Sequence, residues 1–118
     1  MTITLKFGDK ELKCSLGLDF VGELIDDTGV GIDELGARMQ TNPFKLLPRM
    51  VFISAKVEAE LNGEEFTMTQ REVTSLIEGD GGLGSPQCGR FMEAWTKSMT
   101  PNLPQEDDAE EGKKDKKK

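Results

Sequence analysis

The spacing of apolar residues changes once along this chain, from a period of two to a helical period near residue 17. Residues 2–7 and 11–16 each alternate apolar and polar side chains, and Gly8-Asp9 separates the two runs. The alternating apolar side chains are Ile3, Leu5, Phe7, Leu12, Cys14 and Leu16. Two period-two runs around a short glycine-containing turn predict a β-hairpin with one buried face. An isolated hairpin is marginal in water, so we expect this face to pack on the helices that follow.

Apolar residues at helical spacing predict four to five helices between residues 18 and 99. The first should end at Thr28-Gly29, where a glycine follows the last apolar residue. Its expected inner face consists of Leu18, Val21, Leu24 and Ile25. A short second helix should present Ile32, Leu35 and Met39 on one face. The fold class we predict is therefore α+β, mainly helical, with the hairpin packed on the helices.

The third helical segment contains a proline whose effect the sequence leaves open. Thr41-Asn42-Pro43 supplies a capping side chain and a proline suited to the first helical position. Pro48 then fits two structures: a separate turn over Phe44–Leu47 with the main helix beginning near Pro48, or one helix kinked at Pro48. We favour the first. Because Met50–Ile53 is apolar nearly all round, this helix should run through the centre of the domain and end near Leu61-Asn62-Gly63.

Two capped helices are expected at the end of the domain. Thr69 and Glu72 match the capping-box pattern, and Ser85-Pro86 pairs a capping residue with a first-turn proline. The segment Gly79–Gly84 satisfies G-x-G-x-x-G, but the dinucleotide fingerprint needs a strand before it, and here a capped helix precedes it. We therefore interpret it as a loop between two helices. In the last helix, Phe91, Met92 and Trp95 form either core or an exposed patch, and the spacing favours core.

Composition argues against several classes of site. The chain of 118 residues contains neither histidine nor tyrosine, which removes the commonest general base and the commonest zinc ligand. Glu78 and Asp80 stand near glycines but lack the ligand spacing of an EF-hand. We expect no enzyme activity, no metal and no cofactor. A net charge of −7 also argues against nucleic acid, because neutralising phosphates requires clustered Lys and Arg.

The compartment can be inferred from the apolar runs and the cysteines. The longest apolar run, Met50–Ile53, is far shorter than the ~20 residues that a bilayer span needs, and the first residues do not resemble a signal peptide. We therefore expect a cytoplasmic protein without membrane association. Cys14 and Cys88 could form a disulfide, but in such a chain two cysteines are more often buried thiols, which we favour.

The sequence divides into a domain and a tail. Residues 1–99 should form a single globular domain, and residues 100–118 a disordered charged tail. The tail has an acidic block, Glu106–Glu111, followed by a basic block, Lys113–Lys118. A solubilising role is the simplest interpretation, and a docking arm for a partner is the alternative.

The order of these elements resembles that of the tail assembly chaperones of long-tailed bacteriophages. The resemblance covers residues 1–99 and is carried by the hairpin, the helix beginning Leu18-Asp19-Phe20-Val21-Gly22-Glu23-Leu24, and Asn42-Pro43-Phe44-Lys45-Leu46-Leu47 leading into a central helix. The capped helix from Thr69 and the charged tail continue it. Pro48 departs from the family pattern.

The resemblance implies a protein of the host cytoplasm that is absent from the mature virion. Its partners would be the long, apolar-striped tape measure protein, which it keeps soluble, and the tail tube protein, which it helps to recruit; self-association and a longer frameshifted form would also be expected. The lysine-rich end is compatible with a frameshift site. Two other classes remain open: a virion structural component such as a tail completion or connector protein, and a small adaptor or inhibitor that binds a host protein.

A chaperone for an apolar-striped helix needs an exposed apolar groove. We predict Phe44, Leu47 and Met50 as partner-binding residues, because Pro48 should prevent their segment from packing as one regular helix. The alternative is that all three belong to the core.

Overall fold

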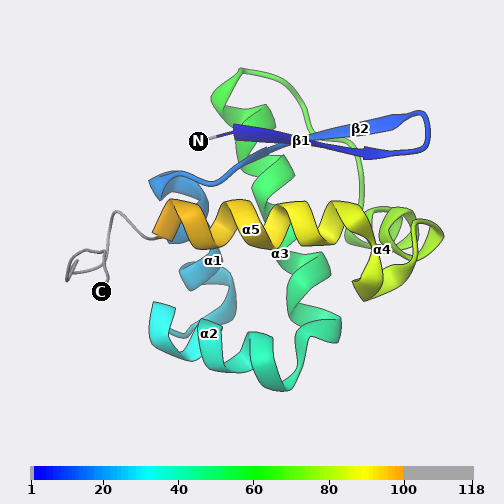
Figure 1. The fold of residues 1–118 in the computed structure, drawn as a ribbon. Helices are drawn as coiled ribbons and strands as arrows, with labels where there is room; N and C mark the ends of the chain where they lie inside the picture. The colour runs from blue at the N-terminus through cyan, green and yellow to red at the C-terminus, as the bar shows by residue number, and fades with distance from the viewer. Residues whose placement is uncertain (1, 100–118) are drawn as a thin grey trace, which may run out of the picture.

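The computed structural model describes residues 2–99 and confirms the predicted fold class, with five helices and an N-terminal hairpin packed on helices. The elements in chain order are β1 (Thr2–Phe7), β2 (Lys10–Ser15), α1 (Leu18–Thr28), α2 (Ile32–Thr41), α3 (Pro43–Leu61), α4 (Gln70–Gly79), the short 3-10 helix η1 (Gly82–Gly84) and α5 (Pro86–Met99). Figure 1 shows the hairpin at one end of the helices and α2 at the opposite end. The predicted tail, residues 100–118, lies outside the described residues.

The hairpin has the predicted register and turn. β1 and β2 are antiparallel, with Leu5 opposite Leu12 and Phe7 opposite Lys10, so Gly8 and Asp9 form a two-residue connection. Gly8 has a φ of 66°, a left-handed conformation that glycine adopts without steric cost. The inner face of the hairpin is buried, and β2 packs on α3 while β1 packs on α5.

Helix α5 closes the outer edge of β1. The backbone N–H of Lys6 donates to Gln87 Oε1 at 2.9 Å, and Arg90 Nη1 donates to the Thr4 carbonyl at 2.9 Å. These two side chains form hydrogen bonds with backbone groups of β1 that point away from β2, so this edge of β1 cannot pair with another strand.

The central helix is α3, as predicted, but it begins at Pro43 and continues through Pro48 without a break. The favoured prediction, a separate turn over Phe44–Leu47, is therefore wrong. Pro48 lacks an N–H and cannot donate to the Phe44 carbonyl, a loss that usually costs about 3 kcal/mol or more. The helix continues because burial compensates for this loss: Pro48 and its neighbours Leu46 and Leu47 are among ten buried residues of α3.

Helix α1 is rotated relative to the prediction. Its buried residues are Phe20 and Leu24, with Val21 and Ile25 packed against the core, whereas Leu18 is 80% exposed. Phe20 decides the rotation, because its ring packs edge-on against Phe91 and Trp95 of α5, with centroid distances of 6.3 and 5.6 Å. Leu18, in the first turn, remains outside.

The last two helices follow the prediction closely. Thr69 and Glu72 form the capping box reciprocally, with hydrogen bonds of 3.1 and 2.8 Å. The glycine-rich segment joins α4 and α5, and the Ser85 hydroxyl caps α5 by accepting from the Gln87 N–H at 3.1 Å. In α5, Phe91 is buried and Met92 and Trp95 pack partly buried against the core, which confirms the core interpretation.

Candidate partner-binding surface

The three residues predicted to bind a partner do not share a surface. Phe44 is 71% exposed on the first turn of α3, whereas Leu47 is 4% and Met50 1% exposed. The predicted exposure of Leu47 and Met50 is wrong, because the helix is continuous and turns both side chains into the core. Phe44 remains as the candidate.

Phe44 lies at a shallow groove of ≈490 Å³ where the ends of three helices meet. We call this groove the Phe44 surface. Its residues are Asp27, Phe44, Lys45, Pro48, Arg49, Gln70 and Thr74. α1 contributes Asp27, α4 contributes Gln70 and Thr74, and α3 contributes the rest.

Arg49 holds the floor of the Phe44 surface together. Its Nε donates to Asp27 Oδ2 at 2.9 Å, and its Nη1 donates to Gln70 Oε1 at 3.0 Å. The guanidinium also lies over the Phe52 ring, 5.2 Å from the centroid. One side chain therefore joins α1, α3 and α4, and the hydrogen bond from Arg49 lowers the pKa of Asp27 below its usual value.

A second groove, of ≈470 Å³, continues from the Phe44 surface towards α2. It shares Lys45 and Arg49 with the first and adds Arg38, which pairs with Glu34 at 3.1 Å. Among residues 2–99 no hydrogen bond or ion pair engages the Lys45 side chain. Of the three cations along these grooves, Arg38 and Arg49 are paired with carboxylates, so within residues 2–99 Lys45 is the cation available to attract an acidic side chain of a partner.

The two cysteines are free buried thiols, as favoured from the sequence. Burial raises the pKa of the Cys14 thiol to about 12 and also raises the pKa of Cys88. Neither thiol has the lowered pKa that nucleophilic cysteines need.

Sequence reasoning did not single out Ser54 or Arg49. Ser54 is fully buried in α3, and its hydroxyl donates to the Ser15 carbonyl at 2.6 Å. Both residues could have been noticed in the sequence, because each is a polar residue within an apolar helical run. A buried polar side chain on a central helix needs a hydrogen-bond partner.

Within residues 2–99 there is no group of three or more His, Cys, Asp or Glu side chains that could hold a metal ion. In the same range, none of the helices has the length and apolar character needed to cross a membrane.

Neither family models, nor curated proteins, nor solved structures yield a match to this chain.

Proposed function

We propose that this protein is a tail assembly chaperone of a long-tailed bacteriophage, which binds the tape measure protein, keeps it soluble and helps to recruit tail tube subunits. It would act in the host cytoplasm, self-associate, and be absent from the mature virion. It would have no enzyme activity. The order of elements supports the family, and the Phe44 surface supports a role in binding protein.

The observation that carries the proposal is the exposure of Phe44. Most apolar side chains of α3 are buried, yet an aromatic ring on its first turn is 71% exposed beside a groove. Large apolar side chains at the rim of a concave surface are typical of protein-binding sites, where aromatic anchors dominate the affinity.

The chemistry of the groove describes the partner. An amphipathic helix would lay its apolar face against Phe44 and Pro48. Acidic side chains flanking that face would meet Lys45, whose ammonium has no partner in residues 2–99. The tape measure protein, which the resemblance describes as long, helical and apolar-striped, is a partner of this kind.

The test is co-expression of the tape measure protein with Phe44→Ala, followed by affinity purification. We expect at least about a tenfold loss of affinity, equivalent to about 1.4 kcal/mol, because the variant removes the anchor. The melting temperature should stay nearly unchanged, since the ring is mostly exposed. Lys45→Glu should weaken the same complex.

The matched controls are Leu18→Ala and Leu61→Ala, which remove exposed apolar side chains outside the groove. Both should bind as the wild type does. Equal binding by Phe44→Ala and the controls would reject the Phe44 surface. Finding the protein in purified virions would reject the chaperone and favour a virion component.

A further inference from the structure

The outer edge of β2 is open, unlike that of β1. Thr4 and Lys6 of β1 direct their backbone groups outward to α5, so their opposite residues, Lys13 and Glu11, direct theirs outward from β2. Ser15, next in this series, uses its outward carbonyl to accept from Ser54. Within residues 2–99, no hydrogen bond reaches the outward backbone groups of Glu11 or Lys13.

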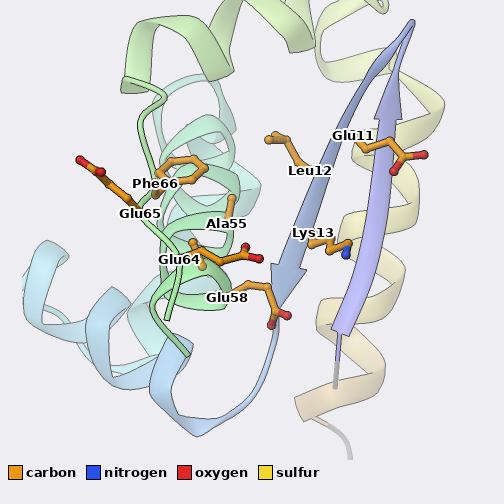
Figure 2. Close-up of a pocket in the computed structure, with 9 residues that line it drawn as sticks. Glu11, Leu12, Lys13, Ala55, Glu58, Glu64, Glu65 and Phe66 are labelled. Carbon is orange, nitrogen blue, oxygen red and sulfur yellow. The ribbon is translucent and has the colours of Figure 1, made fainter. Parts of the chain in front are cut away.

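A slot of ≈250 Å³ lies along this open edge. β2 forms one side, the segment Glu64–Phe66 forms the other, and the small side chains of Ala55 and Ala59 on α3 form the floor. Figure 2 shows Leu12 and Glu64 reaching toward this space, while Glu65 points away from it. The segment Glu64–Phe66 therefore bounds the side of the slot that faces β2.

The slot is acidic at its rim and apolar at its floor. The residues that line it include four glutamates, Glu11, Glu58, Glu64 and Glu65, and one lysine, Lys13, although the carboxylate of Glu65 is directed away from the space. Glu58 Oε2 accepts a hydrogen bond from Asn62 Nδ2 at 2.6 Å, and Glu11 Oε2 forms an ion pair with Lys6 Nζ at 3.8 Å. Glu64 and Glu65 have no such partner in residues 2–99.

We propose that β2 binds an extended segment of a partner protein as a third strand, and that this segment carries lysine or arginine at alternate positions. Its backbone would pair with Glu11 and Lys13. Because side chains of a strand alternate between faces, small apolar residues would lie over Ala55 and Ala59, and the basic residues would face the carboxylates. This surface is separate from the Phe44 surface and does not depend on the function proposed above.

The probe is a short fluorescent peptide of alternating lysine and valine, titrated into the full chain by fluorescence polarisation. The same peptide with glutamate replacing lysine is the negative control. We expect the lysine peptide to bind and the glutamate peptide not to bind. In NMR spectra of the wild type, the bound lysine peptide should shift the Glu11 and Lys13 amides. Binding without those shifts would overturn the proposal, as would equal binding of both peptides or no binding of either.

Charge and backbone contributions can be separated by variants. The double variant Glu64→Lys with Glu65→Lys should bind the lysine peptide at least tenfold more weakly than Glu23→Lys with Asp26→Lys, which changes the net charge equally on exposed positions of α1. Equal weakening by both pairs would show only nonspecific charge attraction and would contradict the slot.

Lys13→Pro removes the outward N–H, whereas Lys13→Ala keeps it. We expect the alanine variant to bind the lysine peptide and the proline variant to lose at least tenfold in affinity. A folded proline variant that binds like the alanine variant would overturn strand pairing. If Lys13→Pro does not fold, the shifts of the Glu11 and Lys13 amides in the wild type decide whether the peptide pairs with β2. Phe44→Ala should bind the peptide as the wild type does, so the proposal for the β2 edge and the proposal for the Phe44 surface are tested independently.

Discussion

Ser54 connects the central helix to the end of the hairpin through one buried hydrogen bond. The helix and β2 are far apart in sequence, and the Ser15 carbonyl has this hydroxyl as its partner at 2.6 Å. Burial makes the bond more consequential than an exposed one, because its loss leaves a carbonyl away from water.

Ser54→Ala should therefore lower the free energy of unfolding by about 1–3 kcal/mol, the usual penalty for an unpaired buried polar group. Urea denaturation of both proteins measures the difference. Ser75→Ala, on the exposed side of α4, is the control and should stay within about 0.5 kcal/mol of the wild type. Equal stabilities of the two variants would show that the Ser54 bond contributes nothing.

The Asp27–Arg49 pair should make stability depend on acid pH. The pKa of Asp27 is lowered in the folded protein, chiefly by the Arg49 hydrogen bond, so the pair stabilises the fold above the unfolded pKa of about 3.9. That contribution is lost as the pH falls through the lower folded pKa. Both side chains are about one-third exposed, at 30% and 38%, which limits the effect to about 1 kcal/mol or less.

Asp27→Asn tests this by urea denaturation at neutral pH and at about pH 3. We expect the variant to be less stable than the wild type at neutral pH, and the difference to shrink on acidification. A difference that is constant across this range would mean that the Asp27 charge is not responsible.

At the scale of elements, local patterns predicted most of the fold because each signal acts over a few residues. The capping box at Thr69, the turn at Gly8 and the period-two runs depend on neighbours in sequence, and all three are confirmed. The rotation of α1 could not be read in the same way, since it depends on the contact of Phe20 with α5, which is distant in sequence.

Pro48 is a second case in which distant contacts override a local sequence signal. Its local effect is to end a helix, but it is one of ten buried residues of α3, and fully burying a large apolar side chain contributes about 1.5–3 kcal/mol. A few such contacts offset the lost hydrogen bond. The continuous helix then buries Leu47 and Met50, which is why only Phe44 of the predicted binding residues reached the surface.

The bonds from α5 to β1 predict a measurable change in one amide. Gln87→Ala removes the acceptor of the Lys6 N–H, so that amide should exchange with solvent faster, and stability should fall by about 0.5–1.5 kcal/mol. Hydrogen exchange followed by NMR measures it. Lys97→Ala, on the exposed part of α5, should leave the Lys6 amide unchanged. Unchanged exchange in Gln87→Ala would contradict the edge closure.

For the whole molecule, the sequence separates a chain segment that can form a core from one that cannot. Residues 2–99 bury a continuous apolar cluster drawn from both strands and all five helices. Residues 100–118, outside the described range, contain few apolar side chains, and burial of apolar area contributes about 25 cal/mol per Å².

Truncation after Met99 should therefore shift the melting temperature by no more than a few degrees, about the shift expected from 1 kcal/mol or less. Calorimetry of the full and truncated chains measures it. A fall of about ten degrees or more would show that the tail docks on the domain, which is the alternative role left open by its composition.

Closure of β1 by α5 joins residues that are 81 positions apart, Lys6 and Gln87. At a synthesis rate of about 5–20 residues per second, the ribosome makes Gln87 roughly 4–16 s after Lys6. Throughout that interval the nascent hairpin has both of its edges unpaired, and an unpaired strand edge is a template for joining other chains. The emerging chain is therefore most vulnerable to aggregation before α5 leaves the exit tunnel, and a pause in translation ahead of residue 86 would prolong that exposure.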